Sequence, residues 1–254
     1  MRSLVVVAGN TFRETIRDKI LYNLVFFALL LIGASVLLST LTIGEQSRIV
    51  NDLGLAAINL VAVIIAIFVG IGLVTKEIER RTIYTILARP ITRVQFILGK
   101  YLGLGFIVAV NIAIMFTMFL ATVWFSGSAI YGSLFQAIGL ILVETLLVMA
   151  VAMFFSTFSS STLSATMTLG IYVIGHLTND LKGIAEKSHN QLTEAVLTAL
   201  YYICPNLELL NIKGQAAAGV QVSLVYQSLA TIYGLLYASL LLAAACVIFQ
   251  RRDF

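Results

Sequence analysis

The sequence has few charged residues for its size. Asp, Glu, Lys and Arg make up 11% of the 254 residues, hydrophobic residues make up 60%, and the mean hydropathy is +1.00. Soluble domains usually contain about 25% charged residues. The composition therefore excludes an ordinary soluble protein and predicts a chain that needs lipid as its solvent.

The sequence also lacks several functional motifs. The phosphate-binding pattern G-x-x-x-x-G-K-[ST] is absent, because Gly99-Lys100 is followed by Tyr101 and the upstream glycine is missing. We therefore predict that this chain is not itself an ATPase. It contains no H-E-x-x-H run either. The two cysteines, Cys204 and Cys246, are predicted near opposite faces of the membrane and cannot pair, so they do not indicate a redox compartment.

Six apolar runs are long enough to cross a bilayer, which takes about 20 residues. They cover residues 20–42, 55–75, 102–125, 133–155, 163–181 and 228–249. A Ser- and Thr-rich turn at 156–162 joins the fourth and fifth runs as a helical hairpin. The sequence predicts an all-α polytopic membrane protein with six transmembrane helices, in a single domain covering residues 1–254.

Two segments outside these runs are also predicted to be helical. Apolar residues recur at helical spacing before the first span, so residues 1–19 are expected to form an amphipathic elbow helix at the membrane surface. The segment 182–227 is too polar to span and too apolar for a free loop. We expect it to form short helices on the outer mouth of the bundle.

The distribution of Lys and Arg predicts the orientation. If the N-terminus is cytoplasmic, twelve of the sixteen basic residues lie on the cytoplasmic side and four on the outer side. Both termini are then cytoplasmic. The basic residues flank apolar runs instead of forming one stripe, so the net charge of +4 does not indicate nucleic-acid binding.

The segment 76–100 between the second and third runs is the most polar part of the chain. With its neighbours it reads TKEIERRTIYTILARPITRVQFILGKY and holds six of the sixteen basic residues. Pro90 interrupts a predicted helix, and Thr92 is a candidate N-cap for the next helix, which leads into Lys100. The pattern predicts a rigid cytoplasmic elbow where a partner docks. A basic loop that binds lipid headgroups is the alternative.

This segment resembles the cytoplasmic segment of ABC-2 type transporter permeases. The matching residues are Glu77, Glu79, Thr82, Leu87, Pro90, Arg93, Gly99 and Lys100. Arg81 departs from the pattern, since many members carry glycine there. The run PNLELLNIK at 205–213 looks like the branch that contains nitrous-oxide-reductase-maturation and gliding-motility permeases.

The resemblance implies a half-transporter with the fold of a type V ABC exporter, in the cytoplasmic membrane of a bacterium or archaeon. Two permease copies would pair, and each would contact a separate ATPase subunit that binds ATP and Mg; this chain would hold no cofactor. The residues implied in the ATPase contact are Glu77, Glu79, Arg80, Arg81, Thr82, Ile83, Leu87, Pro90 and Arg93. The implied function is export by alternating access. The alternative is a membrane anchor through which an ATPase drives mechanical work on an extracytoplasmic partner.

Polar residues within the runs are further candidates. Glu144 is the only acidic residue deep in a predicted span, and such residues are functional candidates by default. Its structural alternative is a protonated carboxyl that bonds to a neighbouring helix through Asn111; we take both as candidates for a translocation path. His176 and Asp180 stand at i, i+4, which predicts a hydrogen-bonded pair more than a metal site. The sequence spacing does not pair Glu144 with His176, which argues against an intramembrane enzyme.

Overall fold

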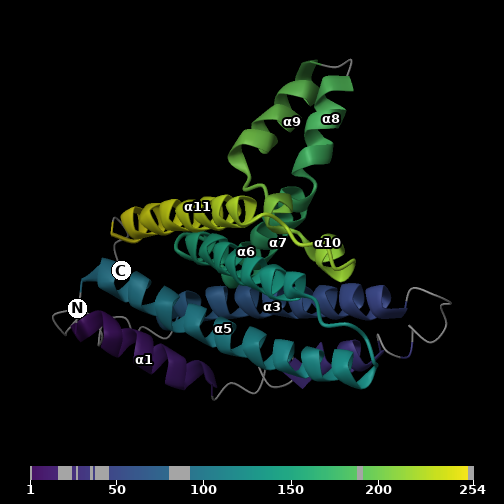
Figure 1. Ribbon diagram of the computed structural model, residues 1–254. Helices are drawn as coiled ribbons and strands as arrows, with labels where there is room; N and C mark the ends of the chain where they lie inside the picture. Colours follow the sequence, from purple (N-terminus) through teal and green to yellow (C-terminus); the bar gives the residue numbers. More distant parts are fainter. Residues whose placement is uncertain are drawn as a thin grey trace.

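The computed structural model describes residues 2–16, 25–26, 28–34, 37, 46–79, 92–187 and 191–250. Within these residues every regular element is a helix (Figure 1). The elements are α1 (Arg2–Ile16), α3 (Gln46–Glu79), α5 (Arg93–Phe125), α6 (Gly132–Ser156), α7 (Ser161–His176), α8 (Thr178–Lys187), α9 (Gln191–Ile203), the 3-10 helix η1 (Glu208–Leu210), α10 (Lys213–Ala217) and α11 (Leu224–Gln250). The all-α prediction is therefore confirmed.

Four described helices are long and apolar enough to cross a membrane. They are Ser47–Gly72 within α3, all of α5, all of α6 and all of α11, and they correspond to the second, third, fourth and sixth predicted spans. The first predicted span, 20–42, lies mostly outside the described residues; those that are described, 25–26, 28–34 and 37, are helical. The chain is thus a multi-pass membrane protein.

The predicted fifth span, 163–181, is not one continuous helix. α7 ends at His176 after 16 residues, which corresponds to about 24 Å, whereas the hydrocarbon core is about 30 Å thick. The Thr178 hydroxyl donates to the carbonyl oxygens of Ile174 and Gly175, at 3.1 and 2.9 Å. The Leu207 amide donates to Gly175 at 3.0 Å. These bonds satisfy carbonyls of the last turn, so the chain can leave the helix there.

Another segment is the alternative fifth crossing. Leu192–Ile203 and Glu208–Ala217 together meet the length and hydropathy of one span, with a bend of 44° between them. The structure therefore has four candidate spans, or five if this bent pair is one, among the described residues. The predicted hairpin is confirmed, since α6 ends at Ser156 and α7 begins at Ser161.

α5 runs antiparallel to α3, α6 and α11. The Arg93 guanidinium nitrogen Nη1 donates to the carbonyl oxygens of Phe249 and Gln250, so the start of α5 and the end of α11 lie together. We call this end of the bundle the Arg93 end, and the end where α6 begins the Gly132 end. Figure 1 shows the start of α1 and the end of α11 near the Arg93 end. This arrangement fits an even number of crossings.

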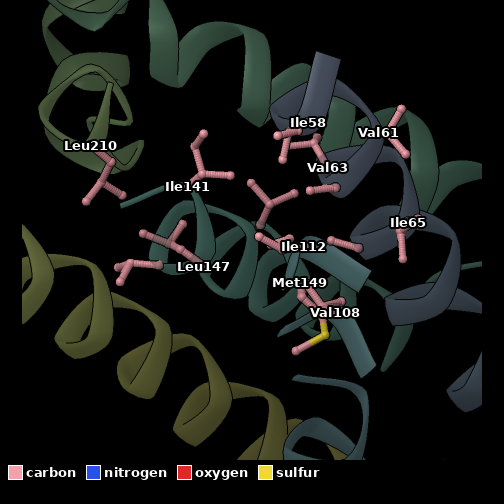
Figure 2. Close-up of a cluster of buried hydrophobic side chains, with 14 of the residues drawn as sticks. Ile58, Val61, Val63, Ile65, Val108, Ile112, Ile141, Leu147, Met149 and Leu210 are labelled. Atoms are coloured by element: carbon pink, nitrogen blue, oxygen red, sulfur yellow. The ribbon is translucent and has the colours of Figure 1, made fainter. Parts of the chain in front are cut away.

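The apolar core lies between α3, α5 and α6. Figure 2 shows buried side chains of all three helices meeting there, including Ile58 and Ile65 from α3, Ile112 from α5, and Ile141 and Met149 from α6. α5 and α11 are less buried than α3 and α6. On α11 an exposed apolar face is formed by Leu229, Ile232, Leu236 and Leu240. Lipid or a second chain would cover such a face in a membrane.

The predicted N-terminal helix is present as α1, but it packs on α5. The rings of Phe12 and Phe106 are 5.1 Å apart between centroids. A Cβ added to Gly103 would lie 2.6 Å from the carbonyl oxygen of Ala8, so this glycine permits the close approach. Figure 1 shows α1 lying lengthwise along α5. Part of the apolar face that was expected to lie in the membrane surface is therefore buried against protein.

The predicted short helices in 182–227 are confirmed, but they form two separate structures. α8 and α9 make a hairpin that extends away from the bundle (Figure 1). The chain then returns, and residues 204–217 pack against α3 and α6 through buried side chains that include Leu207, Leu210 and Ala216. We call residues 204–217 the re-entrant segment. The expectation that this region lies on the outer mouth of the bundle stays a prediction.

Candidate coupling junction and intramembrane polar site

The helix that follows the predicted coupling segment has a well-defined start. Thr92 is the N-cap of α5, and its side-chain oxygen accepts from the Gln95 amide at 3.2 Å. The Gln95 side chain accepts in return from the Thr92 amide at 3.3 Å. This reciprocal pair is a capping box, which satisfies two backbone donors that the helix leaves open. The prediction that Thr92 caps this helix is confirmed.

Arg93 connects the start of α5 to the end of α11. Its Nη1 donates to the carbonyl oxygens of Phe249 at 3.1 Å and Gln250 at 2.9 Å. These are carbonyls of the last turn of α11, where a positive charge is favoured by the helix dipole. The rings of Phe96 and Phe249 stack nearby, 6.1 Å apart. We call the contact of Arg93 and Phe96 with Phe249 and Gln250 the α5–α11 junction.

Lys100 is part of the same region, although it is buried. Its Nζ lies 4.8 Å from the centroid of the Phe96 ring, a cation–π geometry. α5 has 33 residues and is about 50 Å long, longer than the hydrocarbon core. Its first turns therefore extend beyond the membrane core, which explains how Arg93 and Lys100 belong to a helix that also spans.

Most of the predicted ATPase contact lies outside the described residues. This applies to Arg80, Arg81, Thr82, Ile83, Leu87 and Pro90. The backbone of Glu77 and Glu79 belongs to α3, which runs without interruption from the core to Glu79. Arg93 is the predicted contact residue whose side chain is described, and its guanidinium bonds to α11.

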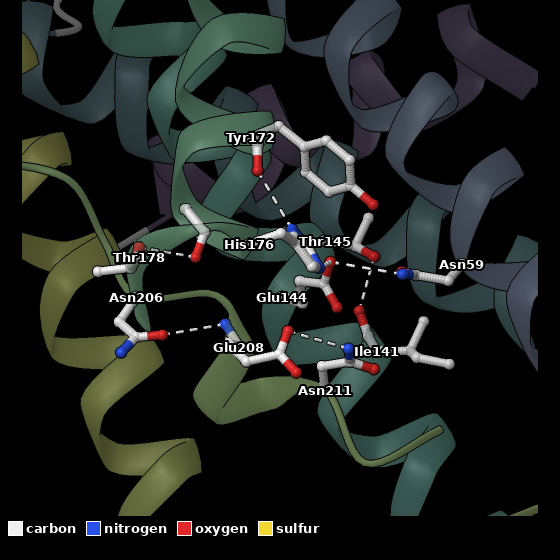
Figure 3. A network of polar contacts seen from close by, with 11 residues as sticks. Asn59, Ile141, Glu144, Thr145, Tyr172, His176, Thr178, Asn206, Glu208 and Asn211 are labelled. Atoms are coloured by element: carbon white, nitrogen blue, oxygen red, sulfur yellow. Dashed lines mark hydrogen bonds and ion pairs between the residues drawn. The ribbon is translucent and has the colours of Figure 1, made fainter. Parts of the chain in front are cut away.

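The second candidate site lies around Glu144, midway along α6 and fully buried. Its carboxyl oxygen Oε1 lies 3.4 Å from Asn59 Nδ2 on α3 and 3.4 Å from His176 Nε2 at the end of α7. Figure 3 shows Glu144 between these two side chains. Glu144 Oε2, Asn59 Oδ1 and His176 Nε2 are buried and have no hydrogen-bond partner of good geometry among the described residues. The site thus joins polar groups from three helices in an apolar bundle.

The end of α7 is held in place by the re-entrant segment. A Cβ added to Gly175 would lie 2.7 Å from the carbonyl oxygen of Pro205 and 2.8 Å from Leu207 Cγ. Glycine at this position therefore lets the re-entrant segment contact α7 closely. The neighbouring His176 ring is fixed by a contact of 3.1 Å between Nδ1 and the Tyr172 carbonyl oxygen.

Tyrosines of α11 hold the other side of the re-entrant segment. The Tyr233 hydroxyl accepts from the Asn206 amide at 2.8 Å, and the Tyr226 hydroxyl donates to the Leu209 carbonyl at 2.9 Å. Within the segment, Glu208 accepts from Asn211 Nδ2 at 3.1 Å. Figure 3 shows Glu208 and Asn211 beside the Glu144 site. The segment thus brings polar groups of its own next to the site.

Three predictions about polar residues need correction. Asn111 donates to the Ile107 carbonyl of its own helix at 2.9 Å, and the amide that contacts Glu144 is Asn59 instead. His176 and Asp180 are not neighbours on one helix, because the helix is interrupted at Leu177, between α7 and α8. Glu144 and His176, which sequence spacing does not pair, are brought together by that same break.

Asn59 is a functional candidate that the sequence analysis missed. The signal was available, since Asn59 is an isolated amide in the apolar run 55–75 and polar residues inside spans are costly. The pairing with His176 had no such signal. Among the described residues there is no group of three or more His, Cys, Asp or Glu side chains that could hold a metal ion. The site is therefore a pair of ionisable groups with an amide beside it.

Together, the spanning helices define a polytopic membrane protein. A family model described as ABC-2 family transporter protein matches residues 5–254. The chain therefore belongs to the ABC-2 transporter family, as its membrane subunit. A comparison with curated proteins gives no match. The family match does not distinguish between branches, so the predicted branch stays a prediction.

Proposed function

We propose that this chain is the permease subunit of an ATP-driven exporter. Two copies pair in the cytoplasmic membrane, with both termini of each on the cytoplasmic side. Each copy binds a separate ATPase subunit, which holds ATP and Mg, through the segment 76–100. Closure of the ATPase subunits moves these segments and switches the permease pair between inward-open and outward-open states.

The observation that supports this proposal most directly is the family match over nearly the whole chain, combined with the missing phosphate loop. A transporter subunit without its own nucleotide site needs a separate source of ATP energy. The structure adds a physical route for coupling. The predicted docking segment stands between α3, which ends at Glu79, and α5, whose capped start is bonded to α11.

Leu87 provides the sharpest test of the docking contact. Ile83 and Leu87 are i, i+4 neighbours on the predicted helix and would fill an apolar groove of the ATPase. Loss of one such buried anchor typically costs about 2 kcal/mol or more of binding free energy. Leu87→Asp should therefore reduce copurification of the ATPase by about 30-fold or more, since 1.4 kcal/mol corresponds to a factor of ten.

The control substitution for Leu87→Asp must not remove a contact that holds the described helices in place. Gln95→Asp is unsuitable, because Gln95 belongs to the capping box of α5. Val220→Asp introduces the same charge at an apolar residue that is exposed in the loop between α10 and α11, outside the candidate spans. We expect Val220→Asp to retain the ATPase. Normal ATPase binding and coupled activity in Leu87→Asp would show that this helix is not the coupling element.

One observation favours a second function. The α8–α9 hairpin extends from the bundle and leaves Leu192, Val196 and Ile203 exposed along α9. Such a hairpin suits an anchor that transmits force to an extracytoplasmic partner. ATPase activity of the reconstituted complex separates the two functions: an exporter is stimulated by its substrate and moves it across the membrane, whereas an anchor hydrolyses ATP without moving a solute.

Glu144 and Asn111 remain proposed residues of the translocation path, with unequal support. Glu144 is buried and bonded across helices, whereas the Asn111 amide is occupied within its own helix. We therefore expect Glu144→Gln to change transport more than Asn111→Leu does. Equal effects of the two substitutions on transport rate would contradict this ranking.

A further inference from the structure

The positions of hydrogens at His176 follow from its partners. Nδ1 lies 3.1 Å from the Tyr172 carbonyl oxygen. A carbonyl oxygen only accepts hydrogen bonds, so Nδ1 carries the hydrogen of this bond. In a neutral imidazole the other nitrogen, Nε2, then has a lone pair and acts as an acceptor.

Nε2 faces the carboxyl group of Glu144 on α6, with 3.4 Å between Nε2 and Oε1. An ionised carboxylate is also an acceptor only. A neutral imidazole and a carboxylate would therefore place two lone pairs opposite each other with nothing between them. A single proton removes this conflict, whether it resides on Oε1 as a carboxylic acid or on Nε2 as an imidazolium.

The surroundings of Glu144 also oppose a bare carboxylate. The side chain is fully buried, and Oε2 has no hydrogen-bond partner among the described residues. Asn59 offers one donor at 3.4 Å, which is long for a hydrogen bond. A buried carboxylate needs several donors or a charged partner to offset the loss of water. The proton shared with His176 supplies the missing compensation.

The charged groups near Glu144 favour one bound proton, because the net charge of the site is then zero. Besides His176, Lys213 of α10 and Glu208 of η1 act electrostatically on Glu144, and their charges have opposite signs. With one proton, Glu144 and His176 together are neutral, and so are Lys213 and Glu208 together. Removing the proton leaves a net charge of about −1, and adding a second leaves about +1, each inside an apolar bundle.

Among the described residues, the other titratable groups near the site are tyrosines. Tyr101 of α5 donates to the Leu146 carbonyl at 3.1 Å, and Tyr233 of α11 accepts from the Asn206 amide. Tyr172 of α7 lies beside Glu144 and Asn59 (Figure 3). A phenol is neutral near pH 7, because it ionises near pH 10. The tyrosines therefore add no charge to the balance.

We propose that Glu144 and His176 form a buried proton-binding site that holds one proton, shared between the carboxyl and the imidazole, at neutral pH. The proton moves from Oε1 to Nε2 as a carboxylic acid and a neutral imidazole become a carboxylate and an imidazolium, and no other reactant is needed. Because Glu144 belongs to α6 and His176 to α7, binding of the proton stabilises the contact between these two helices. By linkage, separation of the helices favours a change in the number of bound protons.

The proton count can be measured on the full chain in lipid nanodiscs. The sequence has two histidines, so His189→Gln leaves His176 as the source of any ring ¹⁵N NMR signal. The ¹⁵N signals distinguish an imidazolium from a neutral ring that carries its hydrogen on Nδ1. In parallel, the carbonyl stretch of a protonated carboxyl is recorded by infrared spectroscopy, and the difference between wild type and Glu144→Gln assigns it to Glu144.

At neutral pH we expect one of two results: a neutral His176 ring with a carboxylic-acid band from Glu144, or an imidazolium with no such band. Either result gives one proton. A neutral ring without the band gives no proton, and an imidazolium with the band gives two; either of these overturns the proposal. The measurement requires neither an ATPase nor a substrate, so its outcome is independent of the proposed exporter function.

Variants test whether the two residues act as one unit. Glu144→Gln should leave His176 neutral with its hydrogen on Nδ1, because the amide of glutamine donates to Nε2. His176→Gln should leave Glu144 protonated, since no other group then shares the proton. The control Glu194→Gln removes a carboxyl that is exposed on α9 and should leave the infrared and NMR signals unchanged. A carboxylic-acid band that persists in Glu144→Gln would show that the site has been assigned to the wrong residue.

Discussion

Arg93→Gln should loosen the last turn of α11 without unfolding the bundle. The substitution removes two charge-assisted hydrogen bonds to the carbonyls of Phe249 and Gln250. Hydrogen bonds to charged groups contribute about 1.5–3 kcal/mol, and a cation at a helix C-terminus contributes about 0.3–1 kcal/mol. The guanidinium is partly exposed, so we expect a loss of about 2 kcal/mol in the local opening free energy, less than the sum of these contributions. The open state is then about 30-fold more populated.

Hydrogen–deuterium exchange of the peptide that covers the end of α11 measures this opening directly. Arg93→Lys should give an intermediate rate, because an ammonium keeps the charge but not the planar geometry of the guanidinium. Arg48→Gln removes the same charge at the start of α3, at the Gly132 end, and should leave the end of α11 unchanged. If Arg93→Gln and wild type exchange at the same rate, the α5–α11 junction does not stabilise the last turn.

Two other predictions concern the re-entrant segment and the orientation. Gly175→Ala should destabilise the protein by about 1–3 kcal/mol, because the added Cβ would lie 2.7 Å from the carbonyl oxygen of Pro205, whereas Gly170→Ala on the same helix has open space and should not. Thermal unfolding of the two purified variants checks this difference, and equal losses would contradict the close contact. An impermeant thiol reagent applied from outside should label Ser188→Cys and not Thr85→Cys, and the opposite pattern would reverse the orientation.

The sequence predicted the fold where length and hydropathy decide it. The second, third, fourth and sixth predicted spans correspond to long apolar helices, and Thr92 caps α5 as the helix signals indicate. Helix starts were less well predicted: α3 begins at Gln46, although the apolar run begins at 55. Hydropathy detects where a helix enters lipid, whereas hydrogen bonding and capping determine where it begins.

The break after His176 could not be predicted in the same way. Residues 163–181 are apolar enough for a span, and no proline or charge interrupts them before Asp180. The break depends on a contact that is remote in sequence, between the Leu207 amide and the Gly175 carbonyl. Hydropathy of a single run contains no information about such a contact. The pairing of Glu144 with His176 depends on the same break, so it was missed for the same reason.

The polar site and the predicted docking segment are connected by one helix. α3 carries Asn59 in the bundle and continues without interruption to Glu79, which lies within the predicted docking segment 76–100. The twenty residues between them correspond to about 30 Å of helix. α3 also contacts α6 closely, since a Cβ added to Gly70 would lie 2.9 Å from the Ala152 Cβ. An intact helix moves largely as one body. Under the proposed function, a displacement of the docking segment therefore shifts the Asn59 amide relative to the carboxyl of Glu144.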